Sequence, residues 1–372
     1  MKRQNLLKLI VGVSLAAVMA ISIPLMSGCA APTTPTEPTT PTEPTEPTEP
    51  TTPTEPAQDL PIYKWKVQVV WAPAETRDIA RVWLDELEAA SGGRIEFDLF
   101  SAGELVPDDQ VITALQSGTI DMTQHCSQSI NLPLDIIDLD CYAPFAYEMD
   151  KEWWVMHRYR GLREIYKEAY EELGGIEYIG AITHDPTHLI STRPINTYED
   201  LDGLKINAFA SIAAPFIEAG AVSVVLPVEE FYLSGQTGVV DALAWCGATE
   251  AYNNSWYEVY NNFLTNPIVG GPATATLVNK DSWDALPQDL KDIFYLGEQS
   301  LALRDLIHYY NGEPISRQYF NLTTMPKEDW AKVKASAIKL WDEYAQRSPR
   351  CAQIVEVWKA YDAEVEAAEW WR

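Results

Sequence analysis

Two stretches of this sequence, residues 115–122 and 234–242, repeat one pattern: the end of a helix, then a glycine, then a short apolar strand that includes an aspartate. Their glycines, Gly118 and Gly238, stand 120 positions apart. Each falls where a helix ends before a buried strand and the backbone needs a positive φ, which glycine adopts without steric cost. One copy alone is common in α/β proteins. Because the flanking elements repeat as well, the pattern predicts two similar lobes.

Each copy belongs to a longer alternation of strands and helices. The elements expected in the first lobe are strands at 64–71, 94–100 and 119–123 and helices at 76–90 and 107–115. Those expected in the second lobe are strands at 205–209, 222–226 and 239–244 and helices at 212–219 and 229–234. This order predicts an α/β fold with a mostly parallel sheet in each lobe, flanked by helices. After residue 281 the sequence predicts helices at 287–310, 327–346 and 351–371.

The net negative charge of the chain limits the kinds of molecule that it can bind. The 372 residues carry a formal net charge of -27, and 47% of them are hydrophobic, so the chain can bury a large core. Nucleic acid is not an expected partner, because binding phosphates requires a basic surface. A polybasic grip on anionic lipid is excluded for the same reason. An acidic body also repels anions at long range, so local donors must hold any anionic ligand.

The first 29 residues are typical of a secretory signal. Lys2, Arg3 and Lys8 form a basic start, and an uncharged apolar run follows from Leu9 to Leu25. The segment from Leu25 to Cys29 reads LMSGC and resembles the bacterial lipobox, in which the cysteine is lipidated and becomes the new N-terminus. The alternative is a transmembrane anchor, for which the run is short. We therefore expect a signal peptide at 1–28 and a lipid (palmitate among its chains) on Cys29 that anchors the protein to a bilayer.

A low-complexity tract links this anchor to the rest of the chain. Residues 32–56 repeat threonine, proline and glutamate and contain no aliphatic residue to bury. Such a tract favours an extended polyproline-type spacer, whose reach at about 3.1 Å per residue is roughly 75–80 Å. The lipidated cysteine and this linker, 29–58, are expected to hold a domain at 59–372 away from a membrane.

A ligand site is expected where strands end. Ligands of open parallel sheets bind beyond the carboxyl ends of the strands, and domain interfaces favour pockets. The first strand runs into Trp71, the strand after Gly118 into Gln124 and His125, and the strand after Gly238 into Ala244 and Trp245. These positions predict the lining of a cleft between the lobes.

Catalytic and metal-binding motifs are missing from the sequence. It contains no H-E-x-x-H, G-x-S-x-G, G-x-G-x-x-G, phosphate loop or C-x-x-C. His184 and His188 are four apart, but Pro186 disfavours the helix that would let them share zinc. We expect them in a loop that points polar groups into the cleft. The sequence thus predicts no enzyme, no cofactor and no metal.

The sequence leaves open whether the cysteines form a disulfide and whether two of the tryptophans line a ligand site. Of Cys126, Cys141, Cys246 and Cys351, the first two are the best candidate for a disulfide, and buried free thiols are the alternative. Helical spacing predicts that five tryptophans belong to the core, namely Trp83, Trp153, Trp283, Trp330 and Trp341. Trp71 and Trp245, at strand ends, fit a ligand wall and plain core equally well.

The chain resembles the solute-binding subunits of TRAP transporters, the DctP-like family, from about residue 63 to residue 341. The motifs that carry the resemblance are SGGRI (91–95), SAGEL (101–105), ALQSGTID (114–121), RPI (193–195), EDLDGLKI (199–206), the segment 220–227, TGVVD (237–241), NKDSW (279–283) and LP (286–287). Each is weak alone, and their order makes the resemblance specific.

This resemblance implies a two-lobe fold of the periplasmic-binding-protein type that closes on a small organic solute by a hinge motion. It implies crossing strands and a long late helix between the lobes, and delivery of the solute to a small and a large membrane subunit. Lobe 1 is expected at about 59–183 and 268–320, and lobe 2 at about 184–267 with residues 321–372 packing across. A sensory lipoprotein on the same fold and a secreted hydrolase are the alternatives.

Two departures from the family pattern concern the ligand. Most members clamp an organic acid with an arginine directly after the G-L-K-I run, where this chain has Asn207. A subgroup that resembles 2-oxoacid binders holds a cation with a Glu-Trp pair, which here reads Ala244-Trp245. An asparagine amide compensates a buried carboxylate poorly. We interpret this as a ligand that is neutral or weakly polar at that end; the alternative is a charge met by His184, His188 or His125.

The expected ligand-binding residues combine the strand ends with the family positions. They are Trp71, Gln124, His125, His184, His188, Asn207, Phe209, Trp245 and Glu250. Packing between the lobes is the alternative role for each of them.

Overall fold

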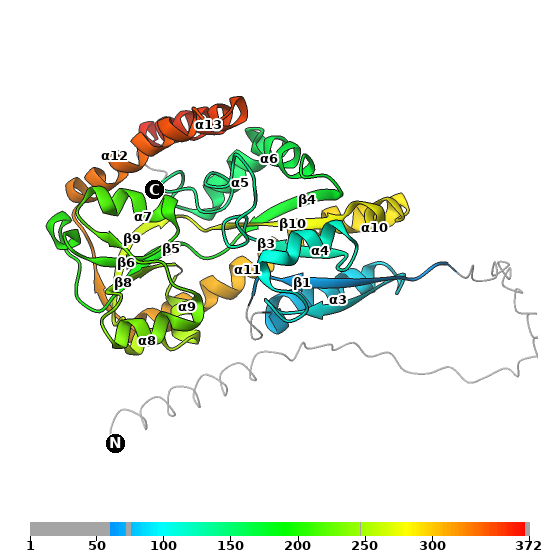
Figure 1. The fold of residues 1–372 in the computed structure, drawn as a ribbon, viewed down its shortest axis with the longest axis horizontal. Coiled ribbons are helices and arrows are strands. Elements are labelled where there is room, and N and C mark those ends of the chain that lie inside the picture. Colours follow the sequence, from blue (N-terminus) through cyan, green and yellow to red (C-terminus); the bar gives the residue numbers. More distant parts are fainter. Residues whose placement is uncertain (1–59, 72–75, 246, 369–372) are drawn as a thin grey trace, which may run out of the picture. The chain divides into compact units, whose positions relative to one another are not determined.

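The computed structural model describes residues 60–71, 76–245 and 247–368 (Figure 1). The signal peptide, Cys29 and the linker therefore lie outside the described residues, as does Cys246. Within these ranges, no helix is both long enough and apolar enough to span a bilayer.

The first sheet has the strand order β2-β1-β3-β10-β4. Its strands are β1 (Tyr63–Val69), β2 (Ile95–Phe100), β3 (Met122–His125), β4 (Ile176–Thr183) and β10 (Ala273–Asn279). The strands β2, β1 and β3 run parallel, whereas β10 is antiparallel to both of its neighbours. The sheet is thus parallel over the part that the sequence predicts, and its antiparallel strand, β10, comes from a later segment of the chain.

The second sheet has the order β11-β9-β5-β8-β6-β7. Its strands are β5 (Thr187–Ser191), β6 (Lys205–Asn207), β7 (Val222–Ser223), β8 (Ala242–Ala244), β9 (Asn262–Val269) and β11 (Asn321–Thr323). Here β7, β6 and β8 are parallel, and β5 is antiparallel to β8 and β9. Both sheets are therefore mixed, and each is built around one parallel β-α-β-α-β unit.

Helices flank both sheets. Those of the first unit and its extension are η1 (Thr76–Arg81), α3 (Val82–Ala90), η2 (Asp108–Gln110), α4 (Val111–Gln116), α5 (Asp150–Tyr159) and α6 (Leu162–Glu171). Those of the second are η3 (Tyr198–Leu201), α7 (Ala210–Glu218), η4 (Val228–Glu230), α8 (Phe231–Gln236), α9 (Ala248–Asn253) and η5 (Trp256–Glu258). The later helices are α10 (Lys280–Asp284), α11 (Gln288–Ser316), η6 (Arg317–Tyr319), α12 (Lys327–Tyr344) and α13 (Pro349–Ala367).

The repeat predicted from the sequence is present in atomic detail. Gly118 and Gly238 both have a φ of 72°, each directly after a short helix. The aspartate of each copy accepts a hydrogen bond from a backbone amide of the first strand of its unit. Asp121 Oδ2 accepts from Lys66 N at 2.8 Å, and Asp241 Oδ2 accepts from Lys205 N at 3.1 Å. The two units are therefore structural repeats, as their shared pattern predicts.

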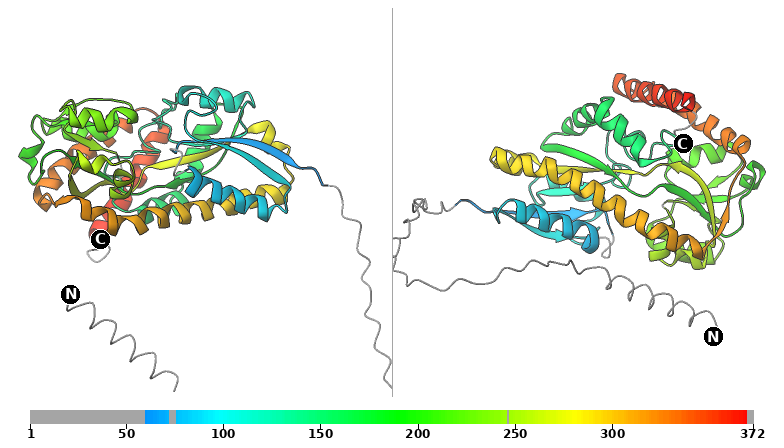
Figure 2. Two further views of the ribbon diagram at one scale, coloured as in Figure 1. Left: turned by 90° about the horizontal axis from the view of Figure 1, so that it is seen from below. Right: turned by 180° about the vertical axis from the view of Figure 1, so that it is seen from behind.

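The chain passes between the sheets at two short crossings. Residues 184–186 join β4 to β5, and residues 270–272 join β9 to β10. Helix α11 runs along both sheets and contacts β4 and α3 on one side of the crossings and α9 on the other (Figure 2). Two lobes joined by crossing strands and a long helix are what the family resemblance implies.

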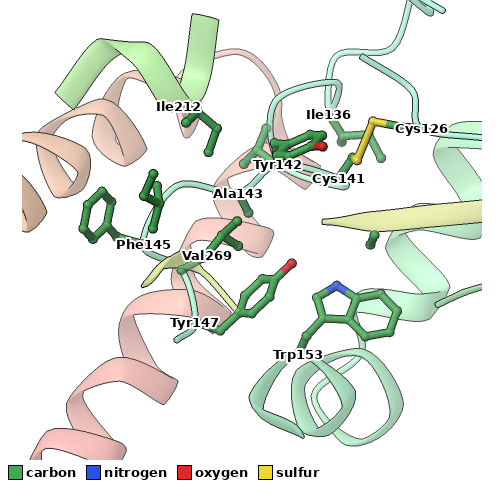
Figure 3. Packing of buried hydrophobic residues seen from close by; sticks show 14 of the residues in the cluster. Cys126, Ile136, Cys141, Tyr142, Ala143, Phe145, Tyr147, Trp153, Ile212 and Val269 are labelled. Carbon is green, nitrogen blue, oxygen red and sulfur yellow. A yellow bond between two sulfur atoms is a disulfide. The ribbon is translucent and has the colours of Figure 1, made fainter. Parts of the chain in front are cut away.

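Aromatic and aliphatic side chains fill the core on both sides of the crossings. The five tryptophans that the sequence assigns to the core are all buried, so this prediction is confirmed. The largest cluster continues from Trp153 in α5 past Ile206 in β6 to Trp341 in α12, so the C-terminal helices share the core of both sheets. The sulfur atoms of Cys126 and Cys141 form a disulfide within this cluster (Figure 3), with Cα atoms 6.0 Å apart. Cys351 is a buried free thiol.

Candidate functional site

Trp71 and His184 meet at the first crossing between the sheets. Their rings are perpendicular, with centroids 5.6 Å apart. Both nitrogens of His184 are engaged, since Nδ1 lies 3.0 Å from Asp305 Oδ2 on α11 and Nε2 lies 2.9 Å from Thr274 Oγ1 on β10. His184 is thus held rigidly between the crossing strands and the long helix, and its nitrogens are committed to protein partners.

His188 does not lie in a loop, as the sequence suggested, but in the middle of strand β5. Its Nδ1 donates to the carbonyl oxygen of Leu264 at 2.9 Å, and its ring packs on Phe263. Burial and the nearby charge of Arg317 lower the pKa of His188 to about 4. Its imidazole is therefore neutral at physiological pH and offers no charge to a carboxylate. As expected from Pro186, this segment is not helical. The chain after Pro186 forms strand β5 because it pairs with β8 and β9.

Gln124 and His125 end strand β3. The side chain of Gln124 is only 1% exposed, and neither atom of its amide has a hydrogen-bond partner among the described residues. Such an amide is costly to bury unless a ligand or a water satisfies it. His125 points to the opposite face of the strand, where Nδ1 lies 3.1 Å from Ser129 Oγ and Nε2 lies 3.7 Å from Asp108 Oδ1. The proximity of the His125 ring lowers the pKa of Asp108.

Three aromatic rings meet where the two sheets approach each other. Phe209 follows β6 and Trp245 follows β8, whereas Tyr142 directly follows Cys141 of the disulfide, near Ile212 of α7 (Figure 3). The ring centroids of Phe209 lie 4.9 Å from those of Tyr142 and 5.3 Å from those of Trp245. The ends of β6 and β8 therefore lie side by side in the second sheet, and packed rings occupy the space beside Trp245.

Asn207, the residue at the family's arginine position, is part of the backbone framework of its lobe. It is 2% exposed, and its Oδ1 accepts a hydrogen bond from Leu226 N at 2.8 Å. The oxygen is thus committed to the loop after β7. Only the amide NH2 remains to serve a ligand, and this group can donate to a neutral oxygen.

Comparison with known proteins identifies the family to which this fold and site belong. Residues 71–347 match the model of the bacterial extracellular solute-binding proteins, family 7, also called DctP. The chain belongs to this family. It is the extracytoplasmic solute-binding subunit of a TRAP-type transporter, and it captures a small organic solute.

Individual relatives agree with the family match. A monocarboxylate 2-oxoacid-binding periplasmic protein of Nostoc sp. is 24% identical over 82% of this chain and 86% of its own length. A TRAP solute-binding protein of Chromohalobacter salexigens, solved with (S)-(+)-2-amino-1-propanol, is 32% identical, with a TM-score of 0.76 over 83% of this chain and 98% of that one. One from Pseudoalteromonas atlantica, solved with sodium and pyruvate, is 20% identical, with a TM-score of 0.72 over 82% and 95%.

Sequence reasoning missed one group of the TRAP subunit, the carboxylates at the first crossing. Asp185 Oδ2 accepts from Gly247 N at 2.8 Å, and Glu313 Oε1 on α11 accepts from Thr249 N at 3.0 Å. A Cβ at Gly247 would lie 2.4 Å from Asp185 Oδ2 and 2.7 Å from Glu313 Oε1, so a side chain there would have to displace both carboxylates. The sequence feature that could have indicated this group is Asp185 itself, which stands between His184 and Pro186 in a segment that joins two strands.

The first crossing is bonded to the segment that follows β8. Thr187 Oγ1 donates to the carbonyl oxygen of Trp245 at 3.4 Å, next to the contact between Asp185 and Gly247. Glu250 lies in α9, near enough to act on the charge of Asp185. His125 and His188 instead hold protein partners away from the aromatic rings. A separate cavity of about 380 Å³ lies between α6 and α13, lined by Arg160, Ile165, Gln353 and Tyr361 among others, far from these residues in the fold.

Proposed function

We propose that this TRAP subunit takes a small polar solute that lacks a carboxylate at the Asn207 end, and that it binds this solute without chemical change. The observation that carries the proposal is the commitment of Asn207 Oδ1 to Leu226 N, which leaves an uncharged NH2 donor where the family clamps an acid. A single neutral donor compensates little of the free energy that is lost when a carboxylate is removed from water.

The neighbouring histidines do not replace the missing arginine. His188 is neutral at physiological pH, and both nitrogens of His184 have protein partners. The Chromohalobacter relative, 32% identical, holds 2-amino-1-propanol, a solute without a carboxylate. The more distant Nostoc protein is named for 2-oxoacids, and this chain departs from such binders at Ala244. These features favour an alcohol or an amine over an acid.

The proposed site lies at the seam between the lobes. Trp71 and His184 form one side of it, Phe209 and Trp245 the other, and the unsatisfied amide of Gln124 and the acid Glu250 supply polar groups. Asn207 donates its NH2, whereas His125 and His188 support the site from behind. Because Tyr142 packs on Phe209 and Trp245, a solute enters when the lobes open at residues 184–186 and 270–272.

The subunit is proposed to be a lipoprotein. A signal peptide at 1–28, a lipid on Cys29 and a linker to residue 58 would hold the solute-binding domain, divided into lobes as the sequence predicts, at an extracytoplasmic membrane surface. From there it would pass its solute to the small and large membrane subunits of the transporter.

A thermal-unfolding screen tests the ligand class. The full chain in detergent is mixed with amino alcohols, polyols and aromatic compounds on one side and with pyruvate, lactate and succinate on the other. We expect a rise in Tm with members of the first group, because a ligand of the folded state stabilises it by mass action. The rise in Tm should be absent in Trp245→Ala. It should be retained in the control variant Glu229→Gln, which changes an exposed residue outside the proposed site. A larger shift with the acids would refute the proposal.

A further inference from the structure

Asp185 is a buried carboxylate with half of its hydrogen-bonding capacity unused. It is 2% exposed and stands at the first crossing, between β4 and β5. Its Oδ2 accepts from Gly247 N at 2.8 Å, and no described residue donates to its other oxygen. A carboxylate held this way, without a cation, is costly to bury.

The groups that face Asp185 increase this cost. Glu250 on α9 and Glu313 and Asp305 on α11 all repel its charge. Arg317 Nε donates to Glu313 Oε2 at 2.6 Å, and His184 Nδ1 lies 3.0 Å from Asp305 Oδ2. Asp305 Oδ1, fully buried, has no partner either. No basic side chain among the described residues forms an ion pair with Asp185, so a cation beside it would stabilise its charged form.

We propose that Asp185 binds a protonated amine of the transported solute and thereby selects cationic solutes over neutral and anionic ones. This deepens the proposed function above and rests on it. An ammonium group is compact and carries three donors, so it can serve the open oxygen of Asp185 while Oδ2 stays bound to Gly247.

The position of Asp185 suits recognition of a small amine. It directly follows His184, whose ring meets Trp71, and precedes Thr187, which is bonded to the carbonyl group of Trp245. Aromatic faces add attraction for an ammonium ion. A metal ion is a poorer fit, because no three histidine, cysteine, aspartate or glutamate side chains within the described part of the chain are grouped to hold one.

Three small solutes that differ at one end test the inference on the full chain in detergent. Ethanolamine, ethylene glycol and glycolate present an ammonium, a hydroxyl and a carboxylate beside the same hydroxymethyl group. By calorimetric titration we expect ethanolamine to bind at least tenfold more tightly than ethylene glycol, and glycolate not to bind. Asp185→Asn keeps an oxygen for Gly247 N but removes the charge, so ethanolamine affinity should fall by roughly ten- to a hundredfold while glycol affinity stays unchanged.

Controls separate charge selection from a folding effect. Glu229→Gln removes one negative charge from an exposed position and should leave all three affinities unchanged. The unliganded Asp185→Asn variant should unfold at the same or a higher temperature, because a repelled carboxylate has been removed. If it fails to fold, the solute series on the unaltered chain still decides the question.

Several results would overturn the inference. They are equal binding of the three solutes, a preference for glycolate, an ethanolamine affinity that survives Asp185→Asn, or stabilisation by sodium or calcium ions in place of the amine. Absence of binding by all three solutes also rejects it. If polyols or aromatic compounds from the wider screen still bind, the proposed function stands without this inference; if no solute of any class binds, both fall.

Discussion

The carboxylate of Glu298 fills the space that a side chain at position 180 would need. A Cβ on Gly180 would lie 1.9 Å from Glu298 Oε1, so the long helix α11 approaches strand β4 with a buried acid in place of an apolar residue. Arg158 Nη2 lies 3.5 Å from Glu298 Oε2, and Oε1 has no partner among the described residues. The contact between α11 and the first sheet therefore contains an incompletely compensated charge.

Stability should depend on pH through this carboxyl group. Burial raises the pKa of Glu298 to about 7 against the attraction of Arg158 and Arg163, and burial also raises the pKa of Asp140 to about 7. A carboxyl group whose pKa is higher in the folded state stabilises the fold below its unfolded pKa, and this stability is lost as pH rises towards 7. We expect urea unfolding to show less stability at pH 8 than at pH 5.

The variant Glu298→Gln isolates the contribution of one group. It should be more stable than the unaltered chain at pH 8, by on the order of 2–3 kcal/mol, and equal to it near pH 4.5. Glu229→Gln, an exposed change of the same type, should show no such difference between the two pH values. A gain that is the same at both pH values would show that packing, and not ionisation, is responsible.

The disulfide between Cys126 and Cys141 should stabilise the segment that presents Tyr142. It closes a loop of 15 residues in sequence separation. Loop closure of this length is worth about 3 kcal/mol, so the double variant with alanine at both positions should lose roughly that much in denaturant unfolding. A reductant should lower the stability of the unaltered chain and leave the double variant unchanged. Equal stability of the two proteins without reductant would contradict the prediction.

Asn207→Ala should weaken both the fold and the site. It removes the acceptor of Leu226 N, and an unsatisfied buried amide costs about 1–3 kcal/mol. The loss is measured by urea unfolding, with Asn196→Ala as the control, because Asn196 is exposed and such changes stay within about 0.5 kcal/mol. Solute affinity should fall in parallel. Tight carboxylate binding that survives Asn207→Ala would show that acids are held elsewhere.

The lipobox resemblance predicts a modification at one residue. In bacterial cells that are fed labelled palmitate, the unaltered protein should carry the label and sediment with membranes. Cys29→Ala should carry no label, because the acceptor thiol is gone, whereas Cys351→Ala should remain labelled. Retention of the label in Cys29→Ala would place the lipid on another residue or exclude lipidation by this route.

Much of the scaffold could be predicted from local pattern. The parallel strands β1, β2 and β3 and their counterparts β6 and β8 lie where alternation and glycine-terminated helices place them, although β3 and β8 begin three residues later than expected. The strands β4, β5, β9 and β10, which form the antiparallel pairs, escaped prediction because they place polar residues such as Glu177, His188 and Thr276 at buried positions, so hydrophobicity does not mark them as strands. Their place in the sheets depends on partners many residues away.

Local sequence patterns were enough to predict the two repeated units, the buried tryptophans and the strand ends that carry Trp71 and Trp245, because helix ends, strand alternation and glycine φ angles are local properties of the chain. Long-range packing was needed to show that Tyr142 packs on Phe209, that His188 is a neutral strand residue and that the carboxylates of Asp185 and Glu313 both lie beside Gly247. These contacts join segments 60 or more positions apart, and their energies come from burial and from opposed charges that no local periodicity records.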